Sequence, residues 1–179
     1  KPAKSLCPKA ISWMKPPRGS IKLNTDASVT TGLAKGGGVI RDFEGTMLGA
    51  FYKEFGECEV VHAEGLALLT GLQWCVETGL SGILVEVDSL ALARLVTSQS
   101  VGKWPLCSVL SQIRLLLGKV NGAISHIYRE ANAVADSLAA LSLESSWVTF
   151  QSHQQLPSRA RSLIHLDAIG YPYIRNVNC

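Results

Sequence analysis

The spacing of the apolar residues changes near residue 60, and this change limits the possible folds more than any other feature. Before it, residues 21–27 alternate apolar and polar side chains, which is the period of a strand. Residues 38–42 and 46–55 also resemble strands, with turn-forming residues at 30–38 and at Glu44–Gly45. No Lys-Ser/Thr pair follows the glycines at 36–38, so we interpret them as a turn rather than a phosphate loop. Three such segments predict an antiparallel meander.

Beyond residue 60, helix-like and strand-like segments alternate. Apolar side chains recur every three or four residues in four segments: 63–79, 89–96, 106–119 and 132–144. Two short apolar runs between them, 83–88 and 123–128, read as strands. Strands that are separated by helices usually run parallel. The chain is therefore predicted to be an α/β protein, with a mixed sheet flanked by helices.

Two flanks enclose this periodic region. Residues 1–20 hold Pro8 and the Pro16–Pro17 pair around Trp13, and they read as an N-terminal linker. Periodicity fades after Ser145. We therefore expect a linker over 1–20, one domain over 21–145 and a C-terminal tail over 146–179. Because the sequence lacks an initiator Met, we also expect it to be a fragment or a processed product.

Composition excludes several classes of protein. Hydrophobic residues make up 47% of the chain, enough for a packed core, and the net charge of +3 is too mild for a protein that coats DNA. No run approaches the roughly 20 apolar residues of a membrane span, and no signal peptide is evident. The five cysteines never form a CxxC pair, which favours thiols in a reducing compartment. We expect an intracellular location, in the nucleus or cytoplasm, with an organelle left open.

Four acidic residues occupy unusual positions. Asp26 and Asp88 lie at strand ends, whereas Glu64 and Asp136 lie near helix starts. In open α/β sheets these positions converge at one crevice. Clustered carboxylates repel one another unless cations neutralise them, and oxygen ligands suit Mg²⁺ or Mn²⁺. A pair of such ions about 3.5–4 Å apart is a standard device for cutting phosphodiesters.

A purely structural explanation also fits most of these acids. The helix dipole favours Glu64 and Asp136 near helix starts, and Asp88 could cap the helix that follows it. Asp26 is harder to explain in this way, because an acid within a central strand is disfavoured. From pattern and position alone, both a metal nuclease and a set of structural acids remain open.

Five motifs point to a family. In chain order, KLNTDAS, GGGVIRD, HAEGLALLTGL, VEVDS and HIYREANAVADSLA resemble the ribonuclease H-like domain common in plants. That family occurs at the C-terminal end of non-LTR retroelement reverse transcriptases and in stand-alone relatives. The resemblance covers residues 21–143. The segment LPSRARSLIHLDAIGYPYIR is similar to the tail that follows this domain in plant retroelements.

The resemblance implies a fold and an activity. The fold would be a five-stranded mixed sheet in the order 3-2-1-4-5, and the activity would be endonucleolytic hydrolysis of the RNA strand in RNA–DNA hybrids. The cofactors would be two Mg²⁺ ions, with Mn²⁺ as a substitute, and the enzyme would activate water without a covalent intermediate. The resemblance implies that the metal ligands are Asp26, Glu64, Asp88 and Asp136. It implies His126 as a further catalytic residue.

Further residues would contact the substrate. Ser28 and Ser89, with the backbone at Ala27, could reach 2′-hydroxyl groups, although many members of the family have glycine where this chain has Ala27. Asn132 matches an asparagine of the family, and Lys103 lies where bacterial relatives carry a longer basic protrusion. We expect the neighbouring Trp104 to be partly buried against the helices.

Three functions from different classes stay open. The first is an active ribonuclease H, acting on RNA–DNA hybrids within or derived from a reverse transcriptase. The second is a domesticated, catalytically silent domain that binds nucleic acid or joins an assembly. The third is another nuclease or resolvase on the same fold, because fold does not determine substrate. The REANAVAD block and its preceding histidine argue against the third.

Overall fold

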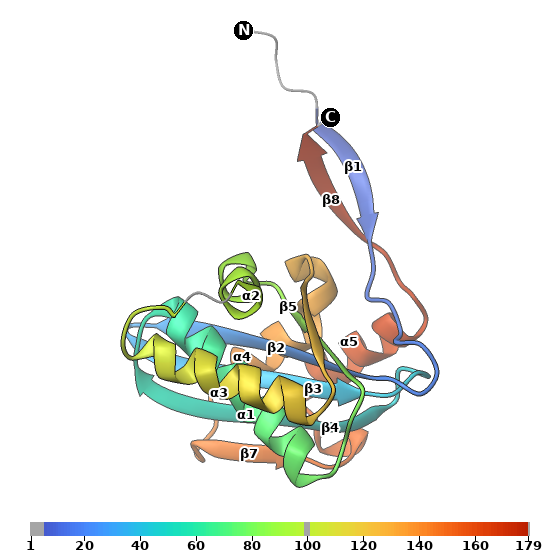
Figure 1. Ribbon diagram of the computed structural model, residues 1–179. Helices are drawn as coiled ribbons and strands as arrows, with labels where there is room; N and C mark the ends of the chain where they lie inside the picture. Colours follow the sequence, from blue (N-terminus) through green and yellow to red (C-terminus); the bar gives the residue numbers. More distant parts are fainter. Residues whose placement is uncertain (1–5, 99–100, 179) are drawn as a thin grey trace, which may run out of the picture.

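A six-stranded mixed sheet forms the centre of the molecule (Figure 1). The computed structural model describes residues 6–98 and 101–178. The strands of this sheet are β2 (Ile21–Thr30), β3 (Leu33–Arg41), β4 (Met47–Glu57), β5 (Ile83–Val87), β6 (Ala123–His126) and β7 (Trp147–Phe150). Their order is β6-β5-β2-β3-β4-β7. Five of them reproduce the predicted order 3-2-1-4-5, and β7 adds a sixth strand beside β4.

Helices cover both faces of the sheet. They are α1 (Val60–Glu77), α2 (Leu90–Thr97), α3 (Leu106–Lys119), α4 (Ala133–Ala139) and α5 (Ser158–Ala168). Helices α1, α2 and α3 share a core with Leu23 and Val85 of the sheet. Helices α4 and α5 pack with Val39 and Tyr52 on the opposite face. The predicted α/β fold with flanking helices is confirmed.

The glycine run at residues 36–38 lies within a strand, so the prediction of a turn over 30–38 is wrong. The turn between β2 and β3 is only Thr31–Gly32, both with positive φ. A Cβ atom at Gly37 would lie 2.5 Å from the backbone nitrogen of Ala139 and 2.6 Å from Cβ of Leu138. Glycine is needed here because α4 packs directly on the strand.

Two helix starts differ from the sequence prediction. Helix α1 begins at Val60, so Glu64 lies inside the helix rather than at its start. Ser89 is the N-cap of α2, and its hydroxyl accepts a hydrogen bond from the Leu92 backbone N–H at 3.3 Å. A helix cap therefore does not explain Asp88. A 3₁₀ turn, η1 (Arg129–Asn132), precedes the short helix α4.

The segment predicted as a C-terminal tail over 146–179 contributes to the packed structure. It supplies β7, a 3₁₀ turn η2 (His153–Gln155) and α5, whose Ala160 and Ile164 are buried. These elements were missed because they are short, and α5 has only a few buried side chains among polar ones.

The two flanks also pair with each other. Strand β1 (Leu6–Ile11) runs antiparallel to β8 (Tyr173–Asn178), and this two-stranded arm projects from the body (Figure 1). Residues 1–5 of the predicted linker lie outside the described part. The linker prediction misses β1. Trp13, which lies between the prolines of the linker, is buried, with 2% of its surface exposed.

The cysteines and helices bear on the compartment and membrane predictions. Cys7 is disulfide-bonded, so the expectation of thiols throughout is wrong at this position. Cys58, Cys75 and Cys107 are free thiols. Within the described residues, each helix is either too short or insufficiently apolar to traverse a bilayer.

Candidate metal centre

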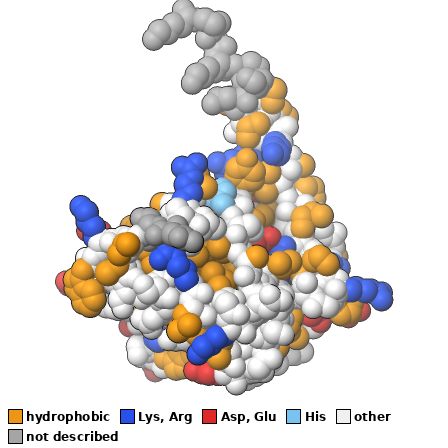
Figure 2. All heavy atoms as spheres, viewed as in Figure 1, with side chains coloured by type: hydrophobic (Ala, Val, Ile, Leu, Met, Phe, Trp, Pro, Cys, Tyr) orange, Lys and Arg blue, Asp and Glu red, His pale blue; other side chains and the backbone are white. Residues whose placement is uncertain are grey.

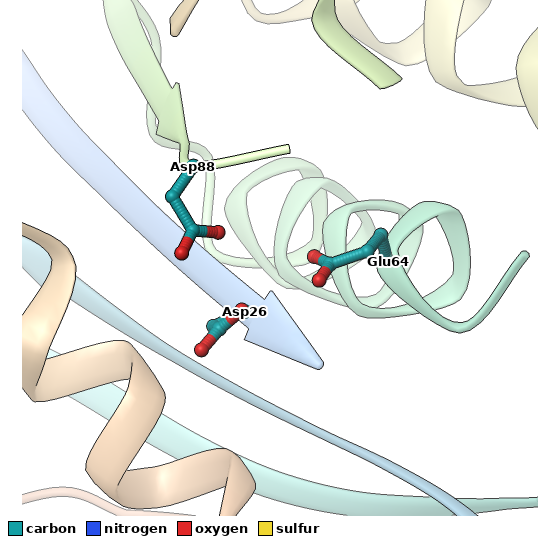
Figure 3. Close-up of side chains that lie close together, drawn as sticks. All are labelled: Asp26, Glu64 and Asp88. Atoms are coloured by element: carbon teal, nitrogen blue, oxygen red, sulfur yellow. The ribbon is translucent and has the colours of Figure 1, made fainter. Parts of the chain in front are cut away.

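Three carboxylates from separate elements converge at one point. Asp26 comes from β2, Glu64 from α1, and Asp88 directly follows β5. One oxygen atom from each lies within 4.8 Å of the others. Figure 3 shows the three side chains directed toward a common space. The topology explains this convergence, because β2 and β5 are adjacent parallel strands that end at the same edge of the sheet.

Burial makes this carboxylate cluster (Asp26, Glu64 and Asp88) electrostatically unfavourable by itself. Asp26 and Glu64 are only 5% and 6% exposed. Burial, with repulsion from Asp88 and Asp136, raises the pKa of Asp26 to about 8. Burial, with repulsion from Asp26 and Asp88, raises the pKa of Glu64 to about 9. Burial also raises the pKa of Asp88. A cation at this point would relieve the repulsion.

The donor atoms fit a hard divalent cation. The Ala27 backbone N–H donates to Oδ1 of Asp26 at 2.9 Å. Oε2 of Glu64 is buried and has no hydrogen-bond partner among the described residues. Such an orphaned acceptor is costly, and the cluster offers only carboxylate oxygens, the ligands that Mg²⁺ and Mn²⁺ prefer. The residues therefore fit the ion that the fold implies.

Asp136, the fourth predicted acid, lies beside the cluster but does not join it. Its Oδ1 accepts hydrogen bonds from Nη2 and Nε of Arg129 at 2.6 and 3.2 Å. Asp136 is still close enough to raise the pKa of both Asp26 and Asp88. The structure thus brings three of the four predicted ligands together and holds the fourth in an ion pair at the rim.

His126 ends β6, beside the carboxyl end of β5. Its backbone pairs with Val87, the residue before Asp88. The imidazole is exposed, and its ring lies 6.2 Å from that of Tyr128 in an edge-on arrangement. His126 is therefore accessible at the edge of the sheet where the carboxylates gather.

The predicted substrate-contacting residues fall into three groups. Ala27 and Ser28 follow Asp26 on β2 and are partly exposed, and Ser89 follows Asp88. Asn132 is buried, 1% exposed, and its side chain donates to the Thr25 carbonyl at 2.9 Å. It supports the strand that carries Asp26 instead of facing the surface.

Lys103 lies apart from these residues, in the loop between α2 and α3. It lines a pocket of about 670 Å³ together with Trp104 and His62. Trp104 is 79% exposed, so the expectation that it is partly buried is wrong. The loop leaves this ring at the surface because α3 begins only at Leu106.

Sequence reasoning missed a second set of buried charged and polar residues, centred on Asn24, two positions before Asp26. We call it the buried ion network, and its members are Trp13, Lys22, Asn24, Arg41, Glu86 and Asp167. Arg41 and Asp167 form an ion pair of 2.6 Å in which each side chain is 1% exposed. Lys22 pairs with Glu86 at 2.7 Å. The alternation in β2 suggested that Lys22 and Asn24 face solvent, whereas the flanks cover them.

Asn24 connects this network to the site. Its Oδ1 accepts hydrogen bonds from Trp13 Nε1 at 3.1 Å and from Arg41 Nη2 at 2.8 Å. Its Nδ2 donates to Glu86 at 3.0 Å and to Asn132 at 3.2 Å. The only sequence signal was a polar residue in a central strand, two positions before Asp26.

Comparison with known proteins is consistent with this geometry. A family model described as "Reverse transcriptase-like" matches residues 24–142. An Arabidopsis thaliana protein named "Putative ribonuclease H protein" is 32% identical over an alignment of 173 positions, and the alignment covers 93% of this chain. The chain spans only 27% of that relative.

Solved ribonucleases H share the fold. The RNase H1 of the archaeon Halobacterium salinarum aligns with a TM-score of 0.62 at 22% identity, covering 67% of this chain and 94% of the other. LC11-RNase H1, isolated from compost and solved in complex with an RNA/DNA hybrid, aligns with a TM-score of 0.60 at 27% identity. That alignment covers 66% of this chain and 93% of the other.

Proposed function

The chain belongs to the reverse transcriptase-like family, as a ribonuclease H-like domain, and from this premise we propose that it hydrolyses the RNA strand of RNA–DNA hybrids. One observation carries the proposal. Asp26, Glu64 and Asp88 direct carboxylate oxygens to one point, and Oε2 of Glu64 is buried without a hydrogen-bond partner among the described residues. A structural acid would be paired with a cation, as Asp167 is with Arg41, whereas none of the salt bridges among the described residues joins these three carboxylates to a cation.

Asp26, Glu64 and Asp88 would hold divalent cations, with Asp136 as a fourth ligand once it leaves Arg129. Bound Mg²⁺ or Mn²⁺ would supply an activated water and would neutralise charge on the scissile phosphate and the leaving oxygen. The carboxylates would determine where the cations lie, because Asp26 is on β2, Asp88 directly follows the adjacent strand β5, and Glu64 is on α1. Hydrolysis of this kind needs no nucleophilic side chain.

Other residues of the site would handle protons and sugar contacts. His126 is exposed beside the strand end, where it could exchange a proton with the departing product. Ser89 uses an oxygen lone pair to cap α2, which leaves its hydroxyl proton to donate to a 2′-hydroxyl. The backbone of Ala27 and the side chain of Ser28, which follow Asp26 on β2, would make similar contacts to the sugar. Contacts of this kind distinguish RNA from DNA.

The domain would work within a larger protein. The Arabidopsis relative is much longer than this chain, and the family description refers to reverse transcriptases. We propose a reverse-transcriptase domain or a comparable assembly as partner, within an intracellular compartment. The free thiols of Cys58, Cys75 and Cys107 support that location, whereas the disulfide at Cys7 does not.

The test is cleavage of an end-labelled RNA–DNA hybrid in Mg²⁺, with single-stranded RNA and duplex DNA as controls. Glu64→Gln should abolish cleavage. Glu77→Gln is the matched control, because Glu77 lies on the same helix but is exposed at its end. We expect hybrid-specific cleavage with 5′-phosphate and 3′-hydroxyl products. Hybrid binding without cleavage by the wild type would instead favour the catalytically silent alternative.

A further inference from the structure

The charge of the chain is distributed very unevenly. The sequence has 17 Lys and Arg and 14 acidic residues. Six of the cations and none of the acids lie in residues 1–20 and 169–179. The remaining 148 residues therefore hold 11 cations and 14 acids, a net charge of −3. A body that is acidic overall repels a polyanion, so the attraction of nucleic acid depends on cations from these two terminal segments, 1–20 and 169–179.

The flanks bring two of these cations to one place. In the arm formed by β1 and β8, Lys9 lies directly opposite Arg175 in the strand register. Like charges in opposite positions destabilise a pair of strands. Both cations nevertheless lie over the ring of Tyr128, with Lys9 Nζ at 5.3 Å and the Arg175 guanidinium at 4.6 Å from its centroid.

The arm is attached at the rim of the carboxylate cluster. Arg175 donates to both oxygens of Glu130 in η1, at 3.0 and 2.9 Å. Ile11 and Trp13 pack against Ala131 of the same turn. The neighbouring Arg129 holds Asp136. The arm is thus anchored to η1, the turn whose Arg129 pairs with Asp136 beside the carboxylate cluster.

A hollow separates the base of the arm from the end of β6. It has a volume of about 350 Å³ and is lined by β1 and by the segment from His126 to Ala131, including Tyr128. In Figure 2, Lys and Arg side chains gather with a His on the surface below the arm. Arg175 is neutralised by Glu130, whereas Lys9 forms no ion pair within the described residues. In the described part of the chain, Lys9 is therefore a cation without a counter-ion, and it lies over Tyr128.

We propose that the β1–β8 arm is a nucleic-acid clamp, in which Lys9, held over Tyr128 beside the neutralised Arg175, binds the phosphate backbone of the duplex that enters the carboxylate site. The identity of that duplex as an RNA–DNA hybrid rests on the proposed function. The phosphate contact itself does not depend on the sugar, so the arm should bind duplex DNA in the same way.

The test is binding by the full chain, measured as fluorescence anisotropy of a labelled RNA–DNA hybrid in EDTA, over a series of NaCl concentrations. Lys9→Gln should weaken binding about fivefold at low salt and reduce the slope of log affinity against log salt by about one. Lys119→Gln is the control, since Lys119 is equally exposed but precedes β6, at the end opposite His126. It should bind as the wild type does.

A merely structural role for Lys9 is tested by two further measurements. Lys9→Gln should keep the melting temperature of the wild type, and Lys9→Arg should restore both affinity and salt slope. Equal affinity and slope for Lys9→Gln, Lys119→Gln and the wild type would overturn the clamp. Such equal binding would refute the clamp but would not change the cleavage activity of the wild type. Conversely, a wild type that does not cleave the hybrid would refute the proposed function but would not remove the difference in binding between Lys9→Gln and the wild type. The two proposals can therefore fail separately.

Discussion

Strand β2 carries two buried polar sites, at Asn24 and at Asp26, in which the charges are arranged in opposite ways. At Asn24, the buried ion network combines two cations and two anions, each cation within 3 Å of an anion. At Asp26, three carboxylates face one another with no cation among the side chains of the cluster. The first arrangement is neutral and links the flanks to the sheet. The second concentrates like charges, which an external cation would neutralise under the proposed function.

The difference shows which buried charges serve the structure and which serve chemistry. Buried ion pairs become costly when one partner is removed, because the other charge is left unpaired. A cluster of like charges behaves in the opposite way, since removing one charge relieves the rest. Substitutions at the two sites should therefore change stability in opposite directions, and four measurements follow from this.

The largest effect is expected in the buried ion network. Arg41→Ala leaves Asp167 and Asn24 without their partner and should lower the free energy of unfolding by about 3–5 kcal/mol. Urea denaturation measures this directly. Arg159→Ala, at an exposed position on α5, should change stability by less than about 0.5 kcal/mol. Similar losses for the two variants would show that the network does not stabilise the fold.

The pH dependence of the metal-free protein should be the next largest effect. The pKa values of Asp26 and Glu64 are about 8 and 9, against ordinary values of 3.8 and 4.5. Between these limits the folded state holds more protons than the unfolded state, so stability decreases as pH rises. In EDTA we expect the free energy of unfolding to fall continuously between about pH 5 and pH 9. Stability that is flat or rising over this range would contradict the account.

Asp26→Asn should have a smaller effect, in the opposite direction to Arg41→Ala. Removing one carboxyl group from the cluster should leave the free energy of unfolding unchanged at neutral pH, or raise it by about 1 kcal/mol. The same change should abolish hybrid cleavage. Paired denaturation and cleavage assays test this. If Asp26→Asn unfolds the protein, Asp26 is a structural residue and its assignment to the site fails.

The smallest effect is expected at the rim. Arg129 is highly exposed in its pair with Asp136, and exposed pairs contribute about 0–1 kcal/mol. Arg129→Ala should therefore shift the urea midpoint only slightly. A loss as large as that of Arg41→Ala would mean that Arg129 belongs with the buried network.

The sequence predicted the site better than its surroundings. Alternating residues revealed β2. Because β2 and β5 run parallel and Thr25 pairs with Val87, Asp26 within β2 and Asp88 after β5 had to meet. Lys22 and Asn24 follow the same alternation, but their burial depends on Trp13 and on α5, which lie far away in the chain. A period of two identifies a polar face without showing what covers it.

The packing role of the glycines and the structure of the flanks could not be predicted, because both depend on contacts between residues far apart in the chain. Glycine usually marks a turn, and only the approach of α4 to Gly37 shows that this glycine serves packing. Helix α5 is joined to the sheet by Asp167, a charged residue that reads as exposed. Long-range pairing of β1 with β8 leaves no local signal in either strand.

The central claim is that the carboxylate cluster is built for a divalent cation, and Mn²⁺ titration tests it most directly. Calorimetry should be run on the wild type, on Asp26→Asn and on Glu77→Gln near pH 7.5, with unfolding temperatures measured in parallel. We predict that Mn²⁺ binds the wild type and Glu77→Gln, raises their melting temperatures and releases protons, because ligands with raised pKa values must ionise. Asp26→Asn should lose most of this binding. Equal binding by all three proteins, or none by the wild type, would contradict the account.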